Sequence, residues 1–188
     1  MGERARDRRR TSAFDWYVTG IEGLLGLETE HRRLLPNMMS LVSCDRLREY
    51  LEDRTVPVQR QMRRLELLLR ASRDRQPARK RIQVRGGETP AGMTTSLAAD
   101  LDQLRLVRDA DERDAELVNA SMWIANLKLE QYQATRSSAE RIGLYEATGH
   151  LQRSLDAESA ASERLLRISE RMFAAEMFAA EMFQRVAS

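Results

Sequence analysis

Two carboxylates occupy positions where the sequence pattern places core leucines. Glu28 lies one helical turn after Leu24, and Glu158 lies three residues after Leu155, so each continues the apolar face of a predicted helix. Burying an ionised carboxylate is unfavourable unless it is paired with a cation, hydrogen-bonded or bound to a metal. The chemistry of this protein therefore depends on the groups that neutralise Glu28 and Glu158.

Two cations fall in register with the core-facing sides of other predicted helices. These are Arg54 and Lys128. Arginine can make two parallel hydrogen bonds to a carboxylate, and the lysine ammonium is a compact charge. We therefore predict a buried charge network of Glu28, Arg54, Lys128 and Glu158. The alternative is that Arg54 and Lys128 extend outward from the edge of the bundle to reach solvent.

A metal ion is the other way to neutralise the two carboxylates. A single weakly held ion could use Glu28, Glu158 and His31, although we expect His31 to be a partly exposed helix residue. A pair of iron or manganese ions usually requires about four carboxylates and two imidazoles, and neither His31 nor His150 is well placed to complete such a set. A dinuclear centre would require at least one further carboxylate to face this pair: Glu52, Asp53 or Glu130.

Several other kinds of chemistry are excluded by the residues available. One cysteine, Cys44, allows neither an internal disulfide nor a cysteine zinc site, and two scattered histidines do not form a nucleophilic triad. The formal charge of +2 is too small to indicate nucleic-acid binding. The basic stretches at 4–10 and 73–85 lack interleaved aromatic residues and are predicted to be solvated, so we do not expect a nucleic-acid partner.

Composition predicts a mostly helical protein with one core. The 188 residues are 42% hydrophobic and 32% charged but only 5% aromatic, and glycine and proline are sparse. No apolar run is long enough for a secretory signal or a transmembrane helix. We therefore expect a cytoplasmic protein without a membrane partner.

Apolar periodicity predicts four long helices, over residues 12–34, 43–72, 109–142 and 144–168, and a shorter helix over 94–107. Pro36 is predicted to end the first helix, and Pro57 to kink or break the second. The polar segment 73–93 is a long crossover between two halves that each have a short loop. This order predicts an all-α, ferritin-like four-helix bundle over residues 13–170, with a basic tail at 1–12 and a helical extension at 171–188.

The helical extension contains a five-residue repeat, Met-Phe-Ala-Ala-Glu, beginning at Met172. A five-residue step advances about 500° around a helix, so the repeated phenylalanines do not share one face. The repeat either extends the last helix beyond the bundle or forms an apolar contact with a second copy or another protein.

Four short motifs follow one another along the predicted helices: Glu28 ahead of Leu35-Pro-Asn-Met38, Arg64-Leu65-Glu66, Asp114 with Leu117 and Tyr132, and Leu155-Asp-Ala-Glu158. No single motif is highly specific. Their order and spacing, over about residues 17–170, resemble the bacterial YciE/YciF-type family of stress-associated ferritin-like proteins.

The resemblance implies a core similar to di-iron carboxylate bundles, with inward Glu, His or Gln ligands. Of these ligand positions, Glu28 and Glu158 remain and Gln61 matches one, whereas Arg54 replaces a histidine and Lys128 replaces a glutamate. The resemblance also implies a homodimer and a role in stress physiology. We therefore predict a non-catalytic bundle without a cofactor, acting through self-association or a protein partner. The alternative is an iron or manganese carboxylate protein that binds metal or acts as an oxidoreductase.

Overall fold

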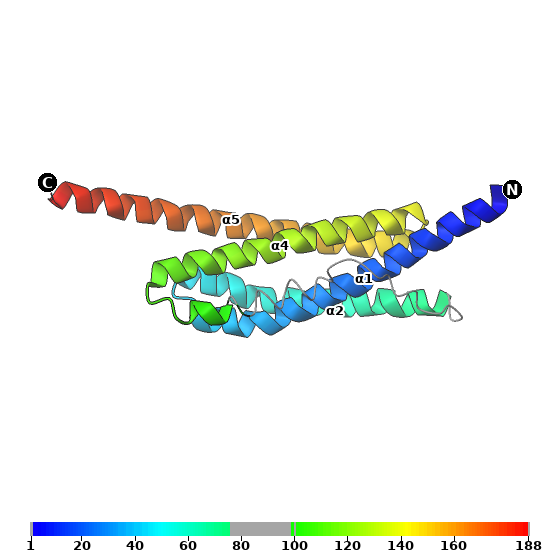
Figure 1. The fold of residues 1–188 in the computed structure, drawn as a ribbon, viewed down its shortest axis with the longest axis horizontal. Coiled ribbons are helices and arrows are strands. Elements are labelled where there is room, and N and C mark those ends of the chain that lie inside the picture. Colours follow the sequence, from blue (N-terminus) through cyan, green and yellow to red (C-terminus); the bar gives the residue numbers. More distant parts are fainter. Residues whose placement is uncertain (1, 76–98, 100, 188) are drawn as a thin grey trace.

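The computed structural model describes residues 2–75, 99 and 101–187, with side chains described from 13 to 174 within those ranges. Four long helices form two antiparallel hairpins: α1 (Gly2–Leu41) with α2 (Asp45–Arg75), and α4 (Ala110–Arg141) with α5 (Tyr145–Ala187). Helix α1 packs against α2 and α4, and α4 packs against α5 (Figure 1). The predicted all-α four-helix bundle is confirmed, and the segment predicted as the crossover lies mostly outside the described residues.

The first helix is longer at both ends than predicted. It begins at Gly2 instead of near residue 12, in a stretch rich in the good helix formers Arg, Glu and Ala. It also continues through Pro36 to Leu41, so the prediction that Pro36 ends it is wrong. Proline removes one backbone hydrogen bond. Burial of Leu35 and Met38 in the core holds the helix together on both sides of the proline.

Helix α2 likewise contains Pro57 without being broken into two pieces. Arg54, Val58 and Gln61 are all buried and keep helical spacing across the proline. The inward face of α2 is therefore continuous, and residues on both sides of Pro57 reach the same core.

Helix α4 has sequence-encoded signals at both ends. The Asp109 side chain accepts hydrogen bonds from the backbone N–H groups of Asp111 and Glu112, at 2.9 and 3.1 Å, which caps the helix. Gly143 follows the last turn with a φ of +74°, a conformation that glycine adopts without strain. The shorter helix predicted over 94–107 is described only at its end, where residues 101–104 are helical.

Side chains of α4 fix the turn between α1 and α2. Asp114 accepts hydrogen bonds from the backbone N–H groups of Ser43 at 2.9 Å and Cys44 at 2.6 Å, next to the start of α2. Arg113 donates to the Leu41 carbonyl and to the Ser43 hydroxyl. These contacts satisfy backbone groups that a helix terminus leaves without partners.

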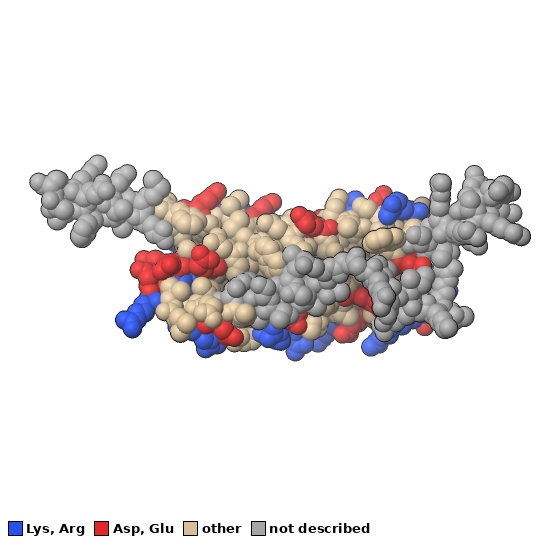
Figure 2. Space-filling model, viewed as in Figure 1, with Lys and Arg blue, Asp and Glu red and all other residues tan. Residues whose placement is uncertain are grey.

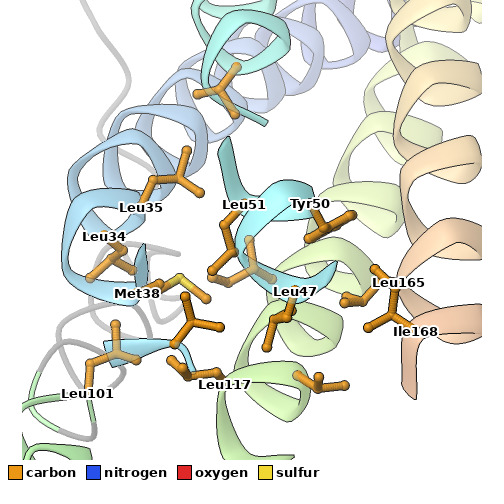
Figure 3. Packing of buried hydrophobic residues seen from close by; sticks show 14 residues of the cluster. Leu34, Leu35, Met38, Leu47, Tyr50, Leu51, Leu101, Leu117, Leu165 and Ile168 are labelled. Atoms are coloured by element: carbon orange, nitrogen blue, oxygen red, sulfur yellow. The ribbon is translucent and has the colours of Figure 1, made fainter. Parts of the chain in front are cut away.

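The core consists of two apolar clusters with a charged layer between them. The first apolar cluster lies near the α1–α2 turn, where Met38, Leu47 and Leu165 are buried together (Figure 3). The second lies near the α4–α5 turn and includes Tyr17 and Leu151. Between these clusters, each long helix contributes a buried polar or charged residue: Glu28, Gln61, Lys128 and Glu158.

The two chain ends lead away from opposite ends of the bundle (Figure 1). Helix α5 continues without interruption through the five-residue repeat to Ala187. Most side chains of the repeat lie outside the described residues, so its predicted contact role remains a prediction. Within the described part of the chain, no helix combines the length and apolar content needed to cross a membrane.

Candidate functional site

Four charged side chains, one from each long helix, lie together between the two apolar clusters. They are Glu28 from α1, Arg54 from α2, Lys128 from α4 and Glu158 from α5. Their exposed fractions are between 0% and 5%, so solvent does not screen their charges. Arg54 and Lys128 do not extend to solvent, so the alternative that they leave the core is wrong.

Lys128 is at the centre of this layer. Its Nζ atom lies 2.9 Å from Oε2 of Glu28 and 3.0 Å from Oε1 of Glu158. It also lies 3.4 Å from Nδ1 of His31. An ammonium has three N–H donors, so these three acceptors match its full donor capacity. One cation thus joins α4 to acceptors on α1 and α5.

His31 is buried, with 7% of its surface exposed, and the expectation of a partly exposed residue is wrong. It follows Glu28 by three positions on α1, which places both side chains towards α4. Burial lowers the pKa of His31 well below its usual value, and the charges of Lys128 and Arg54 act in the same direction. His31 is therefore neutral, and in the tautomer with its proton on Nε2 the Nδ1 atom can accept a hydrogen bond from Lys128.

Glu158 has two cationic partners and one amide partner. Arg54 forms an ion pair with its Oε1 atom, and Gln61 Nε2 donates a hydrogen bond to the same oxygen at 2.8 Å. Burial raises the pKa of Glu158, but the charges of Lys128 and Arg54 outweigh burial and bring the pKa down to about 2. Glu158 is therefore ionised throughout the physiological pH range.

Glu28 has fewer partners than Glu158. The Tyr132 hydroxyl donates a hydrogen bond to its Oε1 atom at 2.9 Å, and Lys128 pairs with the other oxygen. Burial raises the pKa of Glu28, and the attraction of Lys128 opposes that shift. Burial and the Glu28 charge also raise the pKa of Tyr132 well above its usual value, so Tyr132 remains a phenol donor.

The charges in the layer balance. Two carboxylates, Glu28 and Glu158, face two cations, Arg54 and Lys128, so the formal sum is zero. A buried charge set of this kind is held in place because removing one member leaves another charge unpaired in a medium of low polarity. Among the described residues, Gln61 Oε1 and Glu28 Oε2 have no hydrogen-bond partner of good geometry, although Glu28 Oε2 lies 2.9 Å from the Lys128 ammonium.

These residues do not fit the metal centre that the family resemblance implies. Within the described ranges, no group of three or more His, Cys, Asp or Glu side chains is arranged to hold a metal ion. The Lys128 ammonium lies between the two carboxylates, where its positive charge would repel a metal cation. A dinuclear centre would need at least one further carboxylate, and the three candidates are all exposed: Glu52, Asp53 and Glu130.

The sequence placed the four charges on inward faces, but it did not identify their neutral partners. His31 lies three residues after Glu28 and Tyr132 four residues after Lys128, so helical spacing places each beside a predicted charge. Their roles depend on contacts between α1 and α4, which spacing within one helix does not specify. His150, the other histidine, lies near the start of α5 and outside this layer.

The fold is similar to two solved structures. The Escherichia coli stress protein YciF matches with a TM-score of 0.69 and 14% identity, over 88% of this chain and 97% of that chain. YcfI, described as a putative structural protein from Rhodopseudomonas palustris, matches with a TM-score of 0.65 and 21% identity, over 79% of this chain and 89% of that chain. A comparison with curated proteins gave no match.

These similarities confirm the predicted ferritin-like bundle, because both cover most of each chain. The family described as "Domain of unknown function (DUF892)" matches residues 12–178. That range includes the four charged residues and all four long helices except the outer ends of α1 and α5. The chain belongs to the DUF892 family, the YciF-type family that its sequence motifs resemble.

Proposed function

We propose that this protein is a non-catalytic, cytoplasmic bundle in which buried ion pairs replace a metal centre, and that it acts through self-association or a protein partner. The observation that supports this most directly is the position of Lys128. Its Nζ atom is fully buried, within 3.0 Å of carboxylate oxygens from two different helices. The internal ammonium of Lys128 takes the position of a bound metal, since it connects α4 to carboxylates on α1 and α5.

The arrangement also argues against catalysis at this layer. The charged groups are fully buried and neutralise one another, and the layer lies between two apolar clusters. A catalytic acid or base must come within hydrogen-bond reach of a substrate. Glu28, Glu158 and His31 instead contact Lys128 in the interior of the bundle.

Large apolar side chains on the outside of the bundle support the proposal of self-association or partner binding. Trp16 is 60% exposed, and Leu166 and Phe173 are each 47% exposed. Figure 2 shows a band of uncharged residues over α4 and α5 with acidic residues at its borders. Large exposed apolar side chains are typical of protein contact sites. The stress-protein and structural-protein descriptions of the two similar structures are consistent with a role in stress physiology.

The replacement of metal by ion pairs is tested by the dependence of stability on metal. A ligand that binds only the folded state stabilises it by about 2.7 kcal/mol at one hundred times its dissociation constant. We expect the urea unfolding midpoint to be the same with excess EDTA, with added Mn²⁺ and with Fe²⁺ under anaerobic conditions. A midpoint that falls in EDTA and recovers with Mn²⁺ or Fe²⁺ would contradict the proposal.

Self-association is tested separately, by sedimentation equilibrium over a range of concentrations. We expect a dimer that is weakened by Trp16→Ser or Phe173→Ser and unaffected by Ala157→Ser, a change at an exposed position on α5. A protein that is monomeric at every concentration would refute self-association and leave a different protein as the partner. Truncation after Arg171 shows whether the Met-Phe-Ala-Ala-Glu repeat takes part, since an unchanged mass would exclude it.

A further inference from the structure

A pocket of about 550 Å³ lies at the α4–α5 turn, away from the charged layer. Residues from α1, from the second half of α2 and from the first turns of α5 line it. Its volume falls within the roughly 300–1,000 Å³ of typical small-molecule sites. The pocket is independent of the proposed function, because no residue of the charge network lines it.

One part of the pocket is apolar. Leu67, Leu68 and Ala71 contribute from α2, and Leu144 and Ala147 contribute from the start of α5. Leu68 and Ala147 are buried, whereas Leu67 is 63% exposed, so the lining leads from the bundle core out to solvent. Such a surface can accept a short alkyl chain or a single ring and remove it from water.

Cationic side chains also line the pocket, and on α2 they lie before and after this apolar stretch. Arg64, Arg75 and His150 line it, and within the described part of the chain neither arginine belongs to an ion pair. Arg64 Nη1 donates to Ser154 Oγ at 2.7 Å, which orients its guanidinium beside the pocket. Arg75 is exposed at the end of α2. The pocket therefore has positive charge that no carboxylate of the described residues neutralises directly.

Other charged groups around His150 leave this positive character intact. Arg153 Nη2 lies 3.0 Å from Nδ1 of His150 and adds a further cation on α5. Glu146 is the acidic residue of the lining, with its side chain 87% exposed and 4.0 Å from His150 Nε2. The first N–H groups of α5 also face this end of the bundle, and a helix N-terminus favours negative charge.

We infer that this pocket binds a small carboxylic acid with an apolar chain or ring. The carboxylate lies at Arg64, and the apolar part lies along Leu67, Leu68 and Leu144. Arginine binds a carboxylate with two parallel hydrogen bonds, and the Arg64 guanidinium forms no ion pair with a described residue. A cationic ligand would be repelled, and an uncharged ligand of the same length would lose the ionic contacts.

The experiment uses isothermal titration calorimetry of the full chain with three eight-carbon probes: octanoate, 1-octanol and octylammonium. We expect saturable binding of one octanoate per chain, binding of 1-octanol that is weaker by about tenfold or more, and no binding of octylammonium, because 1-octanol lacks the charge-assisted contact. Equal binding of all three probes, or no saturable heat with octanoate, would overturn the inference.

Paired variants locate the site. Arg64→Gln is expected to weaken octanoate binding about tenfold and Arg75→Gln much less, whereas Arg32→Gln, at an exposed position on α1, leaves it unchanged. Ala71→Trp fills the exposed edge of the pocket and should abolish binding, whereas Ala157→Trp, at an exposed position on α5, should not. Octanoate affinity equal to that of wild type in both Arg64→Gln and Ala71→Trp would refute this location.

Discussion

Replacing Lys128 with methionine tests the charge network directly. Methionine has a similar length and is apolar, so the change removes the ammonium while largely preserving packing. Glu28 then keeps only the Tyr132 hydroxyl as a partner, and Glu158 keeps Arg54 and Gln61. One buried carboxylate, Glu28, is left without a counter-charge.

The expected loss of stability follows from that unpaired charge. Removing one partner of a buried ion pair typically costs about 3–5 kcal/mol. For a chain of 188 residues, each kcal/mol lowers the Tm by roughly 2–4 °C, so Lys128→Met should lower the Tm by roughly 6–20 °C. The matched control is Arg32→Met on the exposed side of α1, which should change stability by no more than about 0.5 kcal/mol.

The assay is urea unfolding followed by circular dichroism, at neutral pH and in acid. Without Lys128, the Tyr132 hydrogen bond remains to oppose burial but the attraction of the ammonium is lost, so the pKa of Glu28 rises further. Protonation of Glu28 removes the unpaired charge, so the stability difference between wild type and Lys128→Met should shrink as the pH falls. The double variant Lys128→Met with Glu28→Gln should regain much of the loss at neutral pH, because it leaves the neutral pair of Arg54 and Glu158.

Two results would refute this reasoning. A Lys128→Met protein as stable as wild type would mean that the ammonium is not the counter-charge of Glu28. A loss that is constant with pH and that Glu28→Gln does not reduce would mean that Lys128 contributes through packing alone.

Three further predictions concern Glu158, the α1–α2 turn and the contact of α1 with α4. The pKa of Glu158 falls from 4.5 to about 2 on folding, so its ionisation contributes about 3 kcal/mol to the free energy of unfolding above pH 4.5, and this contribution is lost as the pH falls towards 2. The stabilities of wild type and Glu158→Gln, measured by urea unfolding, should therefore converge in acid. A stability difference that is constant with pH would contradict this. Asp114→Ala should lower the free energy of unfolding by about 1–3 kcal/mol in chemical denaturation, because it leaves the Ser43 and Cys44 N–H groups without acceptors. Asp114→Asn should lose less stability, and equal losses in the two variants would argue against the hydrogen bonds. Gly20→Ala should lower stability by about 1–3 kcal/mol in thermal unfolding, because the added Cβ would lie 2.5 Å from the Thr135 hydroxyl oxygen. Adding Thr135→Ala should restore stability. A Gly20→Ala protein as stable as wild type would show that α1 and α4 can separate at this position.

Much of the bundle could be predicted because its signals are local. Asp109 and Gly143 mark the ends of α4 within one helical turn, and apolar spacing on α2 identifies the face that carries Arg54. The prediction that Pro36 ends α1 is wrong for a physical reason. The missing hydrogen bond is a local effect, whereas the burial of Leu35 and Met38 depends on contacts with other helices.

The partners in the candidate site were harder to predict than its charges. A charge in an apolar stripe is visible from spacing alone, which is why Glu28, Lys128 and Glu158 stand out in the sequence. Their pairing joins residues about one hundred positions apart, such as Lys128 with Glu28 and Arg54 with Glu158. Asp114 is a similar case, because it caps backbone groups some seventy residues earlier in the chain.

The central claim is that the Lys128 ammonium takes the place of a metal ion between Glu28 and Glu158. Elemental analysis of protein produced in medium supplemented with iron and manganese, and purified without chelators, tests this claim most directly. The account predicts far less than one equivalent of iron or manganese per chain, with Lys128→Met and an exposed-site variant such as Arg32→Met measured alongside wild type. One or more equivalents of tightly held metal in the wild-type protein would contradict it.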